Sequence, residues 1–297
     1  MTNCTIKNNS GEENPFDKPA IIICNHQAHI DLMAILALSH KIIVVTNKWV
    51  WNAPFYRWII RYADFYPAEK FDVEDIGPLR NKMQEGYSIA IFPEGTRSED
   101  CSILRFHKGA FYLAKELNVS IIPVMIHGFG YVLPKKYMLL KKGELHIEVL
   151  PRICTDNIDY QELCKETRKM YKEKYSELCK EVETPNYYAD EIINNYIYKG
   201  KDVLNAVRKS LAMNDNYKEL ISAVPETGNV LLRNVGMGEV SLLMALVRKN
   251  ANFTAIIEDE EKYLTANNCA SIPKNLIYSQ EVNEEELFNY IIDCHGE

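Results

Sequence analysis

Residues 18–24 read Lys-Pro-Ala-Ile-Ile-Ile-Cys, and Asn25-His26-Gln27-Ala28-His29-Ile30-Asp31 follows without a break. A continuous apolar run led by a proline predicts a buried strand, and the pattern of residues 30–39 predicts a helix after it. On one regular helix His26 and Asp31 would point about 140° apart, at about 100° per residue. We therefore expect His26 in the strand-to-helix turn, reaching back to Asp31 in the first helical turn.

The same alternation of strand and helix continues along the first half of the chain. Further apolar runs lie at 42–45, 88–92, 120–126 and 145–150, and helical patterns lie at 77–85 and 109–117. This order predicts an α/β fold with its functional turns outside the carboxyl ends of the strands. One such turn is Phe92-Pro93-Glu94-Gly95-Thr96-Arg97-Ser98.

These two turns carry the groups that acyl transfer to an alcohol needs. A histidine can take a proton from an alcohol near neutral pH, and a carboxylate on the far side of the ring fixes its tautomer. A guanidinium such as that of Arg97 can hold a phosphate through two parallel hydrogen bonds. A lone histidine and aspartate at this spacing recur by chance, but the second turn makes an active site the favoured interpretation.

Both turns resemble the signatures of the glycerolipid acyltransferases, Asn-His-x-x-x-x-Asp and Phe-Pro-Glu-Gly-Thr-Arg-Ser, and the resemblance covers about residues 18–152. It implies that His26 and Asp31 are catalytic. The residues that it implies for acceptor binding are Asn25, Glu94, Gly95, Thr96 and Arg97. One block departs from the family pattern, because residues 63–70 lack its arginine. The departure leaves the identity of the acceptor open.

The resemblance implies transfer of a fatty acyl group from an acyl carrier protein or coenzyme A thioester. The acceptor would be the hydroxyl of a lysophospholipid, foremost 1-acyl-glycerol-3-phosphate, in phospholipid or related lipid synthesis. His26 would act as the base, Asp31 would orient it, and backbone amides near Gly95 would stabilise the oxyanion. Acyl transfer of this kind requires no cofactor. Two alternatives stay open: a non-catalytic lipid-binding or scaffold module with relic motifs, and an acyltransferase/methyltransferase fusion acting on a non-glycerol acceptor.

Composition limits the partners and the compartment. The chain has 297 residues, a net charge of −7 and a pI near 5.6, which argues against nucleic acid as a partner. Eight irregularly spaced cysteines are typical of reduced thiols, and no apolar run is long enough to span a bilayer. We therefore expect a cytoplasmic protein, peripherally associated with the inner face of the cell membrane. The aromatic and basic residues between Trp49 and Trp58 predict a membrane surface contact or an acyl-chain tunnel, or else complete the core.

The spacing of His26, His29 and Asp31 also resembles a metal-ligand pattern. A stable site needs three or four ligands, and no further cluster of histidine or cysteine supplies them. The sequence therefore predicts no metal.

The second half of the chain suggests another α/β domain. We expect an acyltransferase domain over 1–154, a helical connector over 155–186, and a Rossmann-like domain over 187–297. In the last of these, a strand at 229–234 leads to the glycine turn of Gly236 and Gly238, then to a helix at 240–248. A second strand at 253–257 ends at Glu258.

This layout resembles the front half of class I S-adenosylmethionine-dependent methyltransferases. Strands are expected at 275–279 and 289–292, and later ones are missing, so the domain is expected to be incomplete, as in a truncated methyltransferase. The resemblance implies S-adenosylmethionine at Gly236, Gly238 and Glu258. Any strand-to-helix turn of this type needs its glycines, however, which favours a structural role over cofactor binding.

Overall fold

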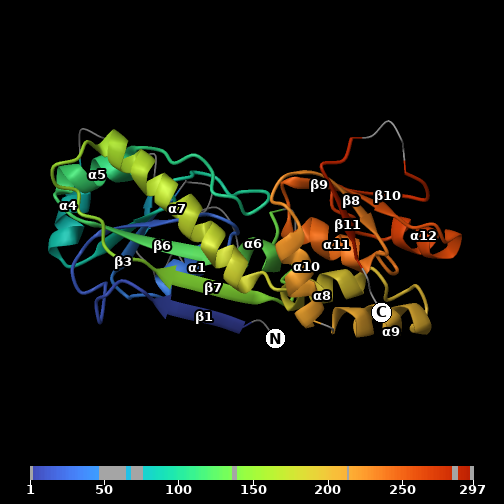
Figure 1. Cartoon of the computed structure of the whole chain (residues 1–297). Helices are drawn as coiled ribbons and strands as arrows, with labels where there is room; N and C mark the ends of the chain where they lie inside the picture. Colours follow the sequence, from blue (N-terminus) through green and yellow to red (C-terminus); the bar gives the residue numbers. More distant parts are fainter. Residues whose placement is uncertain are drawn as a thin grey trace. The chain divides into compact units, whose positions relative to one another are not determined.

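The computed structural model describes residues 3–46, 65–67, 76–135, 139–212, 214–282 and 287–294 (Figure 1). The chain divides into two compact units, Met1–Cys179 and Lys180–Glu297. Helix α7 (Tyr160–Val182), which the sequence suggested as a connector, therefore belongs to the first unit for most of its length. The region of Trp49–Trp58 lies outside the described residues.

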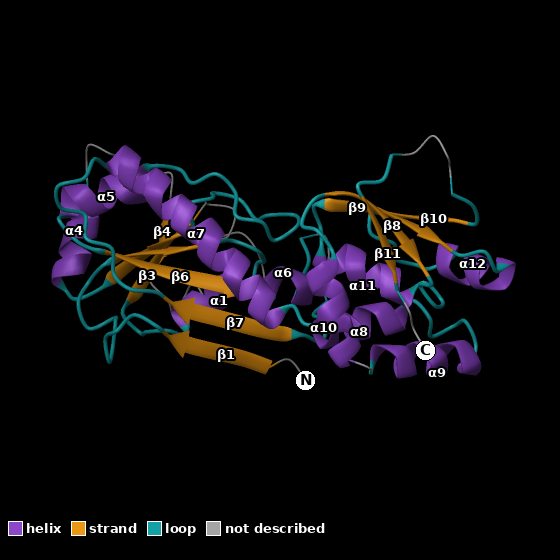
Figure 2. Ribbon diagram, in the orientation of Figure 1, coloured by secondary structure: helices purple, strands orange, loops and turns teal. Residues whose placement is uncertain are grey.

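The first unit is built on a seven-stranded sheet in the order β1-β7-β6-β2-β5-β3-β4 (Figure 2). Its strands are β1 (Asn3–Asn8), β2 (Ile21–Cys24), β3 (Ile42–Thr46), β4 (Phe65–Pro67), β5 (Ser88–Ile91), β6 (Ile121–His127) and β7 (Glu144–Val149). Neighbouring strands are parallel, except for the antiparallel pair β6 and β7. The predicted α/β architecture is confirmed.

Strand β2 lies in the interior of this sheet, between β6 and β5, and every residue in it is buried. Side chains alternate between the two faces of a strand. Ile22 and Cys24 belong to a core cluster with residues of α1 (Asp31–Leu36), such as Ile35, and of α6 (Phe129–Val132). The turn that carries His26 is thus fixed at both ends, by a central strand and by a helix packed on the sheet.

Helices α4 (Gly77–Gln84) and α5 (Gly109–Leu117) contact β5 and β2, respectively. In Figure 1, α7 runs across the sheet. The hydroxyl of Tyr171 on α7 lies 2.7 Å from the carbonyl oxygen of Ile23 and 3.0 Å from that of Val124, and it is a donor to both. This buried tyrosine attaches the helix to β2 and β6.

Strand β1 was not predicted from the sequence. It pairs in parallel with β7 at the edge of the sheet, and nearly all its side chains are exposed. An edge strand that is exposed to solvent on both faces needs no alternation of apolar and polar residues, so its sequence pattern does not predict a strand.

The second unit begins with helices and continues as an α/β sheet. The helices are α8 (Pro185–Asn194), α9 (Lys201–Leu211) and α10 (Asn214–Ala223), followed later by α11 (Glu239–Val247) and α12 (Glu260–Asn267). Helix α8 ends at Asn194, and α9 begins after Gly200, its N-cap residue. Gly200 has a φ of 101°, which a glycine adopts without steric cost.

The sheet of the second unit has four parallel strands in the order β10-β9-β8-β11. They are β8 (Gly228–Arg233), β9 (Ala251–Ile256), β10 (Leu276–Ser279) and β11 (Tyr290–Asp293), so all four predicted strands are present. One face, with Val230, Leu232 and Phe253, packs in a core cluster with α8 and α11. Because the strands are parallel, their carboxyl ends meet at one edge.

Candidate active site

His26 and Asp31 form a hydrogen-bonded pair. The ring Nδ1 of His26 lies 2.8 Å from Oδ2 of Asp31. His26 follows β2 in the turn, and Asp31 is the first residue of α1, as the five-residue spacing predicted. A carboxylate at Nδ1 requires this nitrogen to carry the hydrogen, which leaves Nε2 as the proton acceptor.

The carboxylate of Asp31 is fully buried and is fixed by the turn itself. Besides the ring of His26, its Oδ2 accepts backbone N–H groups from Gln27 at 2.6 Å and Ala28 at 2.8 Å. Burial raises the pKa of the Asp31 carboxyl above its usual value, although the hydrogen bonds from His26 and from the two amides act in the opposite direction. Three donors on one oxygen leave this side chain little freedom to turn away from the histidine.

One face of the His26 ring and the backbone of this residue are held as well. It stacks on Phe92, with ring centroids 4.4 Å apart and planes 28° from parallel. The N–H of Ser98 donates to the carbonyl oxygen of His26 at 3.0 Å. The side chain of His26 remains 21% exposed while its partner Asp31 is 0% exposed, so a substrate can approach the ring but not the carboxylate.

Glu94 is buried and holds two segments of backbone together. One carboxylate oxygen accepts the N–H of His26 at 3.0 Å, and the other accepts the N–H of Leu104 at 2.9 Å. Burial raises the pKa of Glu94 to about 7, against the influence of these two hydrogen bonds. With both oxygens engaged and only 3% of the residue exposed, the geometry favours positioning of His26 over direct contact with an acceptor.

The side chain of Asn25 also binds backbone groups of a neighbouring strand. Its amide donates to the carbonyl oxygen of Ile126 at 2.9 Å and accepts the N–H of the same residue at 2.8 Å. Asn25 is 1% exposed, so it ties the end of β2 to β6 rather than facing solvent. The role in acceptor binding that the family resemblance implied for Asn25 and Glu94 would therefore be indirect.

The remaining residues of the second turn lie closer to solvent. Gly95 and Thr96 are exposed and Arg97 is half-buried. Gly95 has a φ of 66°, and a Cβ there would lie 3.2 Å from the ring of His107, so the position requires glycine. The N–H of Gly95 donates to the carbonyl oxygen of Phe92, which removes that amide from the expected oxyanion donors.

Two further side chains lie near this turn, and the sequence assigned neither of them to the acceptor site. His29 is half-buried, and its pKa is lowered by burial and by the nearby charges of Arg97 and His26. Lys135 comes from beyond α6, and its ammonium group donates to the carbonyl oxygen of Arg97 at 3.3 Å. Lys135 therefore lies beside the backbone of Arg97, and its charge is also paired with Glu99 at 3.7 Å.

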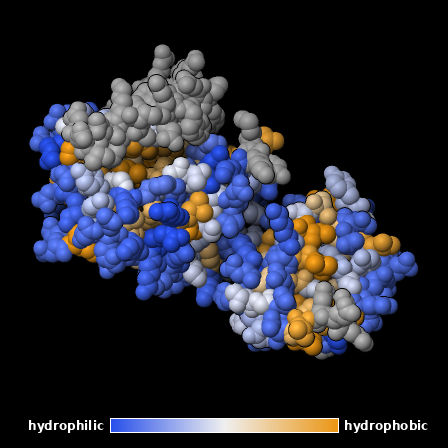
Figure 3. Space-filling model, turned by 90° about the horizontal axis from the view of Figure 1, so that it is seen from above, coloured by the Kyte–Doolittle hydropathy of each residue, from blue (hydrophilic) through white to orange (hydrophobic). Residues whose placement is uncertain are grey.

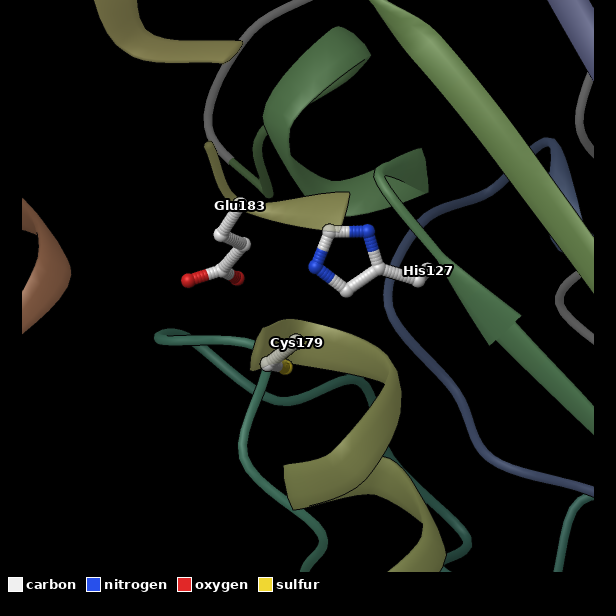
Figure 4. Close-up of side chains that lie close together, drawn as sticks. All are labelled: His127, Cys179 and Glu183. Carbon is white, nitrogen blue, oxygen red and sulfur yellow. The ribbon is translucent and has the colours of Figure 1, made fainter. Parts of the chain in front are cut away.

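A second group of polar side chains lies at the carboxyl end of β6. The ring of His127 and the thiol of Cys179, on α7, bring their ligand atoms within 4.8 Å of each other (Figure 4). Glu183, the third side chain drawn there, belongs to the second unit and is not counted with them. Two ligands are fewer than a zinc site needs, so the absence of a metal stays a prediction.

In the second unit, the structure gives both glycines of the turn after β8 a structural reason. A Cβ on Gly238 would lie 2.7 Å from the Cβ of Ala266 and 3.0 Å from the hydroxyl of Tyr278, so helix and sheet pack directly against it. A Cβ on Gly236 would lie 2.5 Å from the carboxylate of Glu239. That buried carboxylate accepts the N–H of Met237 at 2.7 Å and thus occupies the glycine turn.

A cavity of about 970 Å³ opens at the carboxyl ends of these strands. Gly236 and Glu258 line it, as do Asp259, Glu281 and Asp293 from the ends of neighbouring strands. Of the three residues that the resemblance implied for S-adenosylmethionine, Gly236 and Glu258 line this cavity and Gly238 does not.

Comparison with known proteins finds similar acyltransferases. The family model described as Acyltransferase matches residues 3–127. A 1-acyl-sn-glycerol-3-phosphate acyltransferase of Chlamydomonas reinhardtii is 28% identical over 166 residues, which cover 54% of this chain and 50% of that protein. The 1-acyl-sn-glycerol-3-phosphate acyltransferase of Saccharomyces cerevisiae is 31% identical over 157 residues, which cover 50% of this chain and 52% of that protein.

The crystal structure of the 1-acyl-sn-glycerophosphate acyltransferase PlsC from Thermotoga maritima superposes with a TM-score of 0.50 at 26% identity. The match covers 60% of this chain and 72% of that one. The first unit is thus an α/β acyltransferase domain. The matched part of the chain is similar to glycerolipid acyltransferases, and the chain spans about half the length of the sequence relatives named above.

Proposed function

We propose that the chain transfers a fatty acyl group from a thioester to the hydroxyl of a lysophospholipid-type acceptor, foremost 1-acyl-glycerol-3-phosphate. The observation that carries this proposal is the distance of 2.8 Å between His26 Nδ1 and the buried Asp31 carboxylate. A relic motif in a scaffold protein has no need to keep this pair aligned. The names of the relatives in Chlamydomonas, yeast and Thermotoga support the choice of acceptor.

In the proposed reaction, Nε2 of His26 takes the proton of the acceptor hydroxyl as its oxygen attacks the thioester carbonyl carbon. The carbon–sulfur bond then breaks, and the leaving thiolate receives the proton from the imidazolium. Asp31 keeps the ring oriented and stabilises its transient positive charge. Glu94 and Asn25 hold the backbone of the turn, and Arg97 binds the acceptor's phosphate through its planar fork. This sequence of steps requires no cofactor and no covalent acyl-enzyme.

The second unit is proposed not to transfer methyl groups. The cavity at its strand ends could admit a nucleoside, and Glu258 lies where a ribose would be bound. The carboxylate of Glu239, however, already occupies the turn at Gly236. The residues present therefore do not fit S-adenosylmethionine at the glycine turn, and we propose no reaction of this cofactor there.

The proposed substrate is a membrane lipid, so we also propose that the protein acts peripherally at a membrane surface, at the inner face of the cell membrane. No helix in the described ranges is long and apolar enough to cross a bilayer. The thioester donor is proposed to be acyl carrier protein or coenzyme A.

An assay of the purified chain tests the proposal. Each donor, acyl carrier protein or coenzyme A thioester, is combined with 1-acyl-glycerol-3-phosphate, with a neutral monoacylglycerol and with a non-glycerol alcohol. We expect turnover with the phosphate-bearing acceptor and little with the neutral one, because Arg97 would have no partner. Turnover confined to a non-glycerol acceptor would instead support the fusion alternative, and no turnover with any pair would contradict catalysis.

A further inference from the structure

Between α6 and β7, the chain carries two adjacent leucines that face solvent. Leu139 is 83% exposed and Leu140 is 62% exposed. By contrast, hydrophilic residues predominate on the face of the molecule shown in Figure 3. Leaving two neighbouring leucines in water forgoes a favourable burial, which contact with an apolar phase would restore.

The base of this loop is firmly attached. Val132 and Leu133 are buried at the end of α6, and the N–H of Lys141 donates to the carbonyl oxygen of Val132 at 2.8 Å. A Cβ on Gly143 would lie 2.8 Å from the side chain of Val132, so the returning strand packs closely there. The exposure of the two leucines is therefore a property of an anchored loop and not of a loose chain end.

The leucines lie among positive charges in an otherwise acidic chain. Lys141 and Lys142 follow them directly and are exposed, whereas Lys135, which precedes them, is paired with Glu99 at 3.7 Å. The net charge of the whole chain is −7, so this local excess of lysine is opposite in sign to the protein as a whole. Apolar side chains beside lysines match the two layers of an anionic bilayer, namely its acyl chains and its headgroups.

We propose that Leu139, Leu140, Lys141 and Lys142, here named the leucine-lysine tip, dock on an anionic lipid bilayer. The leucines enter the acyl-chain boundary and the lysines contact the headgroups. This inference rests on the proposed function and deepens it. Lys135, at the base of the tip, donates a hydrogen bond to the carbonyl oxygen of Arg97. The acceptor site would then open beside the membrane that holds its lipid substrate. An acidic carrier protein would form ion pairs with the lysines, but it would not explain the exposed leucine pair.

The test is co-sedimentation of the full chain with vesicles of phosphatidylcholine alone or with added phosphatidylglycerol. The first variant is Leu139→Ser/Leu140→Ser. Its matched control is Leu264→Ser/Leu287→Ser, which alters two leucines of the second unit that are 50% and 87% exposed. We expect the tip variant to bind anionic vesicles at least about tenfold more weakly than the wild type, and the control to bind like the wild type.

A second variant, Lys141→Glu/Lys142→Glu, tests the charge. Its control is Lys165→Glu/Lys174→Glu on α7, which changes the net charge by the same amount at exposed sites. We expect only the tip variant to lose the preference for anionic vesicles. Activity on a short-chain, water-soluble lysolipid should stay unchanged in both tip variants, which separates this inference from the proposed reaction.

Undiminished vesicle binding by the leucine variant would overturn the inference, as would a wild type that does not bind vesicles. Loss of binding in the lysine variant alone would also overturn it, because it would indicate purely electrostatic adsorption without entry of the leucines into the bilayer. Equal losses in tip and control variants would show a general charge or solubility effect and would likewise contradict it. Because binding is measured without turnover, an inactive enzyme would leave this result intact.

Discussion

Asp31→Asn should lower the turnover rate of acyl transfer while preserving the fold. The substitution keeps the shape of a side chain whose Oδ2 accepts three N–H groups, but it removes the negative charge opposite the His26 ring. A hydrogen bond to a charged group contributes about 1.5–3 kcal/mol. Because about 1.4 kcal/mol corresponds to a tenfold change in rate, kcat should fall by about 10- to 100-fold.

The measurement is thiol release from an acyl-coenzyme A donor at saturating acceptor, together with urea unfolding. Stability should stay within about 1 kcal/mol, because losing a buried charge offsets part of the weakened hydrogen bonding. The control is Asp259→Asn, which changes an aspartate that accepts a backbone N–H at the start of α12 in the second unit. A kcat for Asp31→Asn within twofold of the wild type would refute the assigned role of the carboxylate.

Three further predictions follow from the same geometry. The pKa of Glu94 is about 7 in the folded chain and 4.5 ordinarily, so the folded state binds this proton more tightly and loses stability as pH rises between these values. Glu94→Gln cannot titrate, so in urea unfolding its free energy of unfolding relative to the wild type should rise by up to about 3 kcal/mol between pH 4.5 and 8. A difference that does not change with pH would argue against the raised pKa of Glu94. Arg97→Lys should raise the acceptor KM more than the donor KM, since an ammonium cannot form the bidentate contact, and the reverse ranking would assign Arg97 to the thioester. Gly238→Ala should destabilise the second unit by about 1–3 kcal/mol in thermal unfolding, because its methyl group would meet Ala266 at 2.7 Å at a φ of 92°, without changing acyl transfer. Undisturbed stability would contradict the packing role.

The sequence was sufficient for the central sheet of the first unit because its strands are buried on both faces. Continuous apolar runs such as those at β2 and β6 follow directly from that burial. The edge strand β1 has no such burial and was missed. In the second unit, the glycine turn and the four strands were predictable from their local patterns.

In the site, the short-range part was predictable and the long-range part was not. The pairing of His26 with Asp31 follows from five residues of chain and a turn. The contact of Glu94 with Leu104 and the contact of Lys135 with Arg97 depend on how distant loops meet, which no local pattern encodes. For the same reason the sequence assigned Asn25 and Glu94 to the substrate, whereas their side chains hold backbone of the site itself.

The central claim is that His26 is the base of an acyltransferase. The most direct measurement compares turnover of 1-acyl-glycerol-3-phosphate by the purified wild type, by His26→Ala and by His40→Ala, which alters an exposed histidine outside the site. We predict that His26→Ala loses at least about 100-fold in kcat with an unchanged unfolding transition, and that His40→Ala keeps full activity. Wild-type turnover by folded His26→Ala would contradict the account.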